Sequence, residues 1–273
     1  MGHSYVDAFS KEWLIHRRTQ LDSFSGTQES ARAFYEKTGL QAEELKDKIV
    51  LDVGCGTGRF MEVVLQAGCK VAVGVDMSES AKVAQDNLRH YNRDSLNLDR
   101  VMVYQLDLHD LTFPDESFDI IYSIGVLHHT PDTKKAFLAL LRLLKPGGII
   151  AIWVYPDEPW RTWLYNRITG FYRVFTTRMP MGLLYRLCWL AIPLYYLREL
   201  PVIGGIFWLL AALLPISGHP LKEWRWLDTF DWYAPKYQHK HRWHEVVSWF
   251  NGAGLVNVRR NKVSISYRGN KEC

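Results

Sequence analysis

The chain has 273 residues, of which 48% are hydrophobic and 23% are charged, a balance typical of a folded globular protein and not of a disordered one. Its net charge of +4 is mild, and the absence of a basic run argues against a nucleic-acid-binding protein. The four cysteines show no C-x-x-C spacing, which argues against a zinc site or a disulfide framework and favours a reducing compartment. The first residues lack a signal-peptide pattern, so we expect a cytoplasmic protein.

Residues 1–47 precede the first strand that the sequence predicts. Within them, Tyr5–His16 and Gln28–Lys37 carry apolar residues at helical spacing and predict amphipathic helices. The polar stretch Asp22–Gly26 predicts a loop between these helices. We therefore expect an N-terminal helical segment ahead of the main fold.

A glycine-rich turn follows the first predicted strand. This strand is Ile49–Val53, an apolar run rich in β-branched residues, of the kind found inside a parallel sheet. Glycines without a Cβ allow the backbone to adopt positive φ and to lie against a ligand. A helix predicted over Arg59–Gln66 would direct its free N–H groups at the same ligand. The glycines of the turn are Gly54, Gly56 and Gly58.

The spacing of these glycines separates two classes of ligand. The dinucleotide fingerprint requires a glycine where this chain has Arg59, which disfavours an NAD-dependent oxidoreductase. The second predicted strand, Val71–Val75, ends at Asp76, where a doubly wound fold places the acid that binds ribose hydroxyls. Because Ser78 is predicted as the N-cap of the next helix, Asp76 remains available for a nucleoside.

Strands continue to alternate with helices along the chain. Such alternation predicts right-handed crossovers and an open, parallel α/β sheet, which binds ligands at the carboxyl ends of its strands. Asp52, Asp76, Asp107 and Gly125 each lie at or just past a strand end, so we expect them along one edge. The further elements are strands at Val101–Gln105, Phe118–Ile124 and Ile149–Val154, and a helix at Thr133–Leu144 that ends at Lys145–Gly148.

The alternating pattern breaks after the fifth strand. An aromatic-rich stretch, Tyr155–Tyr237, separates that strand from a helix at Trp243–Asn251 and two short strands, Leu255–Arg260 and Val263–Tyr267. We therefore expect four parts. They are an N-terminal helical segment (1–47), a ligand-binding core (48–155), a helical aromatic-rich insert that caps the substrate (156–238), and a C-terminal part that completes the core (239–273).

Five segments of the core carry a resemblance to a known family. They are Leu51–Arg59, Gly74–Ser78, Gln105–Leu108, Phe118–His129 and Leu144–Gly148. In this order and spacing they resemble the motifs of class I S-adenosylmethionine (SAM)-dependent methyltransferases of the ubiquinone/menaquinone-methyltransferase-like type, in a bacterial subgroup with an aromatic-rich insert. The resemblance implies a Rossmann-like, doubly wound, mostly parallel seven-stranded sheet that ends in an antiparallel pair.

The same resemblance implies the cofactor and the residues that hold it. SAM would be the methyl donor and S-adenosylhomocysteine the product. Asp52 and the glycines would hold the methionine part, Asp76 the ribose and Asp107 the adenine amino group, while Gly125 would lie by the methyl donor. Met77 would pack on the adenine or belong to the core. The full set implied is Asp52, Gly54, Cys55, Gly56, Gly58, Asp76, Met77, Asp107, Leu108 and Gly125.

The insert contains a strongly apolar stretch, Leu183–Ile216, that prolines and charged residues interrupt. Its longest apolar run, Leu200–Ile216, is shorter than the about 20 residues that span a bilayer, so we predict no transmembrane helix. Three interpretations stay open: a helical cap, a surface that enters the membrane interface, and a dimer interface. Aromatic residues and arginines support the second, which would make the protein peripheral to a membrane. The sequence leaves the oligomeric state open.

A general base is needed only if the methyl acceptor is a hydroxyl, an acidic carbon or a protonated amine. The stretch Trp224–His241 shows no helical periodicity and predicts a proline-containing loop that forms an active-site wall. A His-x-His metal site at His239 and His241 lacks paired cysteine or carboxylate ligands, so we predict no metal. Each candidate base has a structural alternative, such as capping or solvation. The candidates are His128, His129, Tyr233, Tyr237 and His241.

The sequence therefore predicts a SAM-dependent methyltransferase that acts on a small-molecule or lipid-linked acceptor at oxygen, carbon or nitrogen. The fourth strand ends in Gly125–His129 and not in the motifs typical of nucleobase methylation, which argues against a nucleic-acid acceptor. The alternative is a SAM-binding protein without methyl transfer, whose insert contacts a partner or a membrane.

Overall fold

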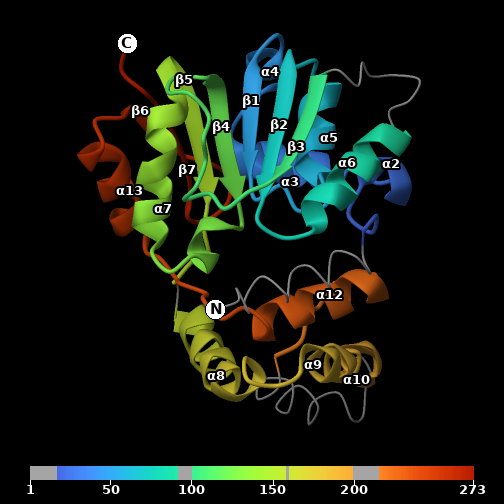
Figure 1. Cartoon of the computed structure of the whole chain (residues 1–273). Helices are drawn as coiled ribbons and strands as arrows, with labels where there is room; N and C mark the ends of the chain where they lie inside the picture. The colour runs from blue at the N-terminus through green and yellow to red at the C-terminus, as the bar shows by residue number, and fades with distance from the viewer. Residues whose placement is uncertain (1–16, 92–99, 158–159, 199–214) are drawn as a thin grey trace. The chain divides into compact units, whose positions relative to one another are not determined.

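The computed structural model describes residues 17–91, 100–157, 160–198 and 215–273 (Figure 1). These residues fall into two compact units. The first unit contains residues 17–156 and 237–273, and the second contains the described part of residues 157–236. The predicted helix Tyr5–His16 lies outside the described residues.

A seven-stranded sheet forms the centre of the first unit (Figure 1). The strand order is β3-β2-β1-β4-β5-β7-β6, and only β7 runs antiparallel to its neighbours. This order confirms the predicted Rossmann-like, mostly parallel fold with its antiparallel final pair. The strands are β1 (Ile49–Val53), β2 (Val71–Asp76), β3 (Val101–Gln105), β4 (Phe118–Ile124), β5 (Leu144–Trp153), β6 (Val256–Arg260) and β7 (Ser266–Asn270).

Helices cover both faces of this sheet, which explains why the central strands are apolar throughout. On one face, Leu51 packs in a core with Phe137 and Phe250. On the other face, Val50 packs in a core with Phe34. The first face is covered by α7 (Thr133–Leu140) and α13 (Trp243–Gly252), and the second by α3 (Glu29–Thr38), α4 (Ala42–Leu45), α5 (Arg59–Gln66) and α6 (Ser80–Tyr91).

Several predicted boundaries differ from those in the structure. The predicted loop Asp22–Gly26 contains a short helix, α2 (Asp22–Ser25), which Gly26 ends at φ 67°. The helix after β4 becomes a 3₁₀ turn at Leu141, and β5 begins at Leu144 because that residue pairs with Phe118. The last strand, β7, starts three residues later than predicted, where it pairs with β5.

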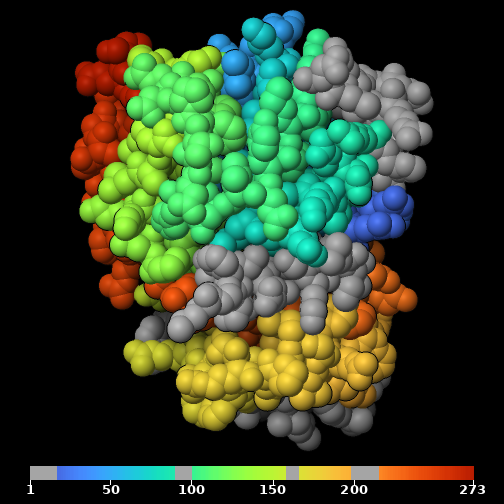
Figure 2. All heavy atoms as spheres, in the orientation of Figure 1, coloured from blue at the N-terminus to red at the C-terminus, as the bar shows by residue number. Residues whose placement is uncertain are grey.

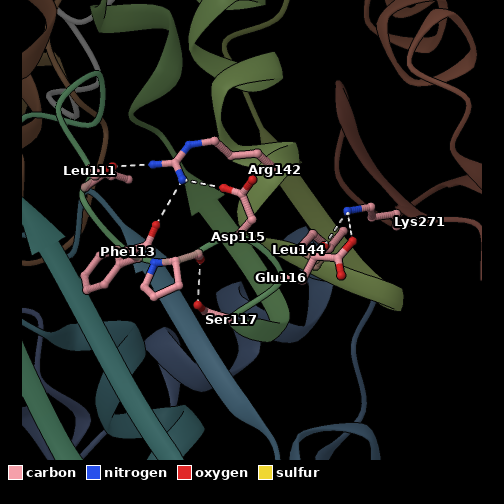
Figure 3. A network of polar contacts seen from close by, with 9 residues as sticks. Leu111, Phe113, Asp115, Glu116, Ser117, Arg142, Leu144 and Lys271 are labelled. Atoms are coloured by element: carbon pink, nitrogen blue, oxygen red, sulfur yellow. Dashed lines mark hydrogen bonds and ion pairs between the residues drawn. The ribbon is translucent and has the colours of Figure 1, made fainter.

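Polar contacts fix the entry into β4 at the amino ends of the strands (Figure 3). The Arg142 guanidinium donates to the Asp115 carboxylate at 2.7 Å, and Lys271 Nζ donates to Glu116 Oε1 at 3.1 Å and to the Leu144 carbonyl at 2.8 Å. Arg142 also donates to two backbone carbonyls, those of Leu111 and Phe113. These contacts stabilise the amino ends of the strands, opposite to the carboxyl ends where a ligand would bind, so we assign them a structural role.

The described part of the second unit is helical, and within it α12 packs against α8, α9 and α10. Leu184 and Cys188 form its core with Phe230 and Tyr233. No helix in the described part of the chain is long and apolar enough to cross a bilayer. The helices are α8 (Trp160–Thr176), α9 (Met181–Cys188), α10 (Ala191–Arg198) and α12 (Lys222–Tyr233).

The helix α12 corrects the prediction of a loop over Trp224–His241. Trp224, Leu227 and Phe230 are buried at a spacing of three residues, and the polar Arg225 and Thr229 complete the buried stripe. A polar residue inside the stripe interrupts the apolar pattern from which a helix is predicted. Only the part after Tyr233 is irregular.

Candidate active site

The glycine turn after β1 has the predicted backbone conformation. Gly54, Gly56 and Gly58 have φ values of 81°, 52° and 86°, a region that residues with a Cβ rarely adopt. Gly54 N donates to the carbonyl oxygen of Val75 at 2.7 Å, which ties the turn to the end of β2. A Cβ on Gly54 would lie 2.3 Å from Val126 Cγ2, so the close approach of these two loops also requires glycine.

Asp76, at the end of β2, joins this turn to the next loop. Its Oδ2 accepts a hydrogen bond from Gly56 N at 2.9 Å, and its Oδ1 accepts from Ser78 N at 2.9 Å and from Ser78 Oγ at 2.6 Å. Ser78 is predicted as the N-cap of the next helix; α6 begins at Ser80, and the Ser78 hydroxyl accepts from Ser80 N at 3.3 Å while it donates to Asp76. The carboxylate is half-buried and points its second oxygen at the glycine turn.

The neighbouring strand ends bring the other predicted cofactor residues to the same edge. Asp107 follows β3, and its Oδ1 accepts from His109 N at 2.9 Å. Gly125 follows β4 with φ 81°, and a Cβ there would lie 3.3 Å from the Trp153 ring. Met77 and Leu108 are half-buried beside Asp76 and Asp107 in the chain. β1 lies between β2 and β4 in the sheet, so these strand ends form a continuous row.

Asp52 is buried inside the domain and not at its surface. Its side chain is 3% exposed, and its Oδ2 has no hydrogen-bond partner among the described residues. Burial, reinforced by the nearby Asp76 carboxylate, raises the pKa of Asp52 to about 8. Tyr122, its neighbour on β4, is likewise buried, and its hydroxyl also has no partner among the described residues. Cys55 is a buried packing residue whose thiol pKa burial raises.

The described start of the N-terminal segment lies over the glycine turn, a position that no local sequence pattern predicts. Arg59, the first residue of α5, donates from Nη1 to Gln20 Oε1 at 2.9 Å. Asn87 Nδ2 donates to the carbonyl oxygens of Arg17 at 2.6 Å and Thr57 at 3.0 Å. These long-range polar pairs tie the segment to α5 and α6, and single-sequence periodicity cannot reveal them.

His128 lies just past the end of β4 in a group of rings. Its ring is fully buried, with its centroid 3.9 Å from that of Tyr155 and 6.4 Å from that of Trp153. Neither ring nitrogen of His128 has a hydrogen-bond partner among the described residues. Burial and the nearby His129 hold the pKa of His128 well below its ordinary value, so the imidazole is neutral at pH 7.

Tyr155 and Lys240 complete this group and were missed at the sequence level. Lys240 Nζ lies 4.3 Å from the centre of the Tyr155 ring. Tyr155 stands two residues after β5, and the rule that ligands bind past strand ends could have indicated it. No sequence pattern points to Lys240.

The remaining candidates in the first unit have defined partners. His129 Nδ1 lies 2.8 Å from the Tyr237 carbonyl oxygen, so Nδ1 carries the proton and Nε2 is the basic nitrogen of a neutral ring. His241 is buried, with Nδ1 at 3.0 Å from Glu245 Oε1 and Nε2 at 2.9 Å from Thr133 Oγ1. Both nitrogens of His241 are therefore engaged in joining the starts of α7 and α13.

Tyr233 belongs to the second unit, where it packs in the core. Its hydroxyl donates to the Pro215 carbonyl oxygen at 2.7 Å, and burial raises its pKa above the ordinary value. His239 and His241 have ring centroids 6.4 Å apart. In the described part of the chain, no three His, Cys, Asp or Glu side chains converge as metal ligands would.

A protein-family model matches the part of the chain that carries these strand ends. Residues 51–152 match the family model described as a methyltransferase domain. These residues are therefore similar to a methyltransferase domain. The matched residues include the glycine turn, Asp76, Asp107 and His128. Such a domain implies the use of SAM, and the turn without Cβ atoms and the acids at the strand ends are compatible with that cofactor.

Curated relatives share this domain. A 27-O-demethylrifamycin SV methyltransferase from Amycolatopsis mediterranei is 35% identical over 103 residues, which cover 38% of this chain and 37% of the relative. A ubiquinone biosynthesis O-methyltransferase from Coxiella burnetii is 40% identical over 105 residues, covering 38% of this chain and 42% of the relative. The chain thus spans about two fifths of the length of these relatives.

A solved structure is similar over more of the chain. A possible exported protein from Bordetella parapertussis aligns with 89% of this chain and 66% of its own, with a TM-score of 0.51 and 15% identity. At this identity the similarity shows the fold alone.

Proposed function

We propose that the chain is a SAM-dependent methyltransferase that transfers a methyl group to a small-molecule or lipid-linked acceptor. The observation that carries the proposal is the hydrogen bond between Asp76 Oδ2 and Gly56 N. It joins the acid at the end of β2 to the glycine turn after β1, where a nucleoside and its amino-acid tail would lie across neighbouring strand ends.

The hydrogen-bonding capacity of the acids supports a nucleoside ligand. A carboxylate has about four acceptor sites, and Asp76 uses three of them for Gly56 and Ser78. The remaining site, on Oδ2, can accept one ribose hydroxyl. Asp107 Oδ2 accepts no hydrogen bond from the described residues and can accept from the adenine amino group. Because Asp52 is buried, we assign it no direct contact with SAM.

His128 is our first candidate to receive a proton from the acceptor on its geometry alone, because its lowered pKa makes the ligand-free imidazole a weak base. An imidazole with two buried nitrogens and no partner leaves polar groups unsatisfied, which costs roughly 1–3 kcal/mol per group. An acceptor hydroxyl would relieve part of this cost by donating to the unprotonated nitrogen. SAM, when bound, would supply the methyl group, and His128 would accept the proton that the acceptor hydroxyl loses as its oxygen takes that methyl group from the sulfur. Alignment and exclusion of water supply the rest of the acceleration.

The other histidines and tyrosines are assigned less direct roles. His129 Nε2 is the second candidate base, since Nδ1 is turned toward the Tyr237 carbonyl. We treat His241 as a positioning residue, because Glu245 and Thr133 occupy both of its nitrogens. The contribution that we assign to Tyr237 is its backbone carbonyl oxygen, which accepts the hydrogen bond from His129 Nδ1. The Coxiella burnetii relative is a ubiquinone biosynthesis O-methyltransferase, which supports oxygen as the methylated atom.

Calorimetric titration with S-adenosylhomocysteine and, separately, with NAD tests the cofactor. We expect micromolar binding of S-adenosylhomocysteine and no binding of NAD; the reverse would remove the proposal. Labelled SAM with phenolic, quinol and lipid-linked acceptors then tests transfer. Tight cofactor binding that no acceptor changes, without turnover, would favour a SAM-binding protein whose insert contacts a partner or membrane.

A further inference from the structure

We propose that the outward faces of α8 and α9 dock on the surface of a bilayer that contains anionic lipids. The proposal concerns the second unit alone and does not depend on methyl transfer. We call these faces the arginine–apolar face. It consists of Arg167, Phe171, Val174, Phe175 and Arg178 on or just after α8, and Leu183, Arg186, Leu187, Trp189 and Leu190 on or just after α9.

One side of α8 packs against its own unit, and the opposite side is exposed to solvent. On the inner side, the Tyr172 ring meets the Tyr233 ring edge-on at 6.1 Å, and Thr176 Oγ1 donates to the Tyr233 carbonyl at 2.8 Å. On the outer side, Phe171 is 63% exposed and Phe175 is 54% exposed. The outer residues of the helix recur at positions 167, 171, 174 and 175, which is the spacing of one helical face, and Arg178 follows in the turn after it.

The next helix, α9, repeats this arrangement. Leu184 and Cys188 are buried in the core of the unit. Leu183, Leu187 and Leu190, at positions i, i+4 and i+7, are exposed. Two consecutive helices therefore present large apolar side chains to solvent, which is more than the scattered exposure expected of an ordinary surface. In Figure 2 the yellow to gold spheres belong to the stretch that contains α8, α9 and α10.

The charges around this surface have one sign. Residues 160–198 contain six arginines and no aspartate, glutamate or lysine. Arg167, Arg178 and Arg186 are exposed on the same faces as the apolar residues. Helices with Phe, Trp and Leu beside Arg suit the boundary between headgroups and acyl chains. Each arginine near an anionic bilayer contributes about 1 kcal/mol to binding.

The same charges argue against a second copy of the chain as the occupant. A two-fold symmetric interface would place this face against itself, and the arginines of one copy would meet those of the other without an acid between them. Like charges at close range are unfavourable. An anionic lipid surface satisfies both the apolar side chains and the arginines.

The experiment is flotation of the full-length chain with vesicles. We expect binding to vesicles of phosphatidylcholine mixed with phosphatidylglycerol, weaker binding to phosphatidylcholine alone, and loss of the difference in high salt. Phe175→Asp should lower the partition coefficient at least tenfold. Phe24→Asp is the matched control, because Phe24 lies in the first unit and is 55% exposed, close to the 54% of Phe175.

Substitution of the arginines tests the electrostatic part. Arg178→Gln and Arg186→Gln should each lower binding to the mixed vesicles about fivefold, the equivalent of about 1 kcal/mol, and change binding to phosphatidylcholine far less. The proposal is overturned if the chain does not float with the mixed vesicles, or if Phe175→Asp and Phe24→Asp behave alike. It is also overturned if light scattering shows a dimer that Phe175→Asp dissociates.

Discussion

Asp76 Oδ2 accepts a hydrogen bond from Gly56 N at 2.9 Å, although the two residues are 20 positions apart in the chain. The bond connects the end of β2 to the turn that follows β1. One carboxylate therefore shapes the glycine turn and remains able to accept a hydroxyl of a bound nucleoside.

Asp76→Ala should weaken the binding of S-adenosylhomocysteine by about 1–3 kcal/mol, because Gly56 N and the ligand both lose an acceptor. Isothermal titration calorimetry measures the change directly. Asp86→Ala, at an exposed position of α6, is the control and should bind like the unmodified chain. Equal affinities of Asp76→Ala and the control would remove Asp76 from the cofactor site.

Gly54→Ala and Gly26→Ala separate backbone strain from steric exclusion. Both glycines have positive φ, 81° and 67°, and each substitution costs about 1–2 kcal/mol of stability for that reason. A Cβ on Gly54 would also lie 2.3 Å from Val126 Cγ2, whereas one on Gly26 meets nothing within 4 Å. We expect Gly54→Ala to lose about 1–3 kcal/mol more in denaturant unfolding. Equal losses would contradict the close approach of the two loops.

The raised pKa of Asp52 predicts that the free energy of unfolding falls as pH rises. Its pKa of about 8 in the folded chain lies above the about 3.9 of an unfolded one, so between these values the unfolded chain binds fewer protons. The free energy of unfolding should therefore fall as pH rises from about 4 to about 8, by up to about 1.4 kcal/mol per pH unit from this group.

Asp52→Asn removes this titration and keeps the shape of the side chain. In urea unfolding, the variant should gain stability over the unmodified chain as pH rises through the same range. Other groups titrate alike in both proteins, so the comparison isolates Asp52. A gap between the two stability curves that does not change with pH would show that Asp52 keeps an ordinary pKa.

His128→Leu and His241→Leu should differ in stability and in activity. His128 leaves two buried nitrogens without partners in the described structure, so its replacement should leave stability unchanged or raise it. His241→Leu removes the hydrogen bonds to Glu245 and to the buried Thr133 and should cost about 1–3 kcal/mol. If His128 is the base, its variant should also lose about 10²–10⁴-fold in turnover with S-adenosylhomocysteine affinity retained. A stability loss in His128→Leu that matches His241→Leu would contradict this assignment.

The strands and the glycine turn of the core could be predicted from the sequence because the patterns that indicate them are local. β1, β3, β4 and α5 have the predicted bounds, since apolar runs, helical spacing and glycines without Cβ act within a few residues. The order of strands and helices then placed Asp76, Asp107 and Gly125 on one edge through the handedness of βαβ crossovers. The sequence by itself therefore determined the fold class and the position of the predicted cofactor edge.

Tertiary contacts decided what the local patterns could not. β7 is polar in sequence but buried between β5 and β6, where Arg268 pairs with Glu44 from α4. Arg225 is buried in α12 because its guanidinium donates to three backbone carbonyls and stacks on Tyr195 at 3.5 Å. The unpartnered nitrogens of His128 and the occupied ones of His241 were equally invisible, because their surroundings come from residues far apart in the chain. Burial and hydrogen-bond satisfaction are properties of the assembled neighbours, and only the folded arrangement fixes them.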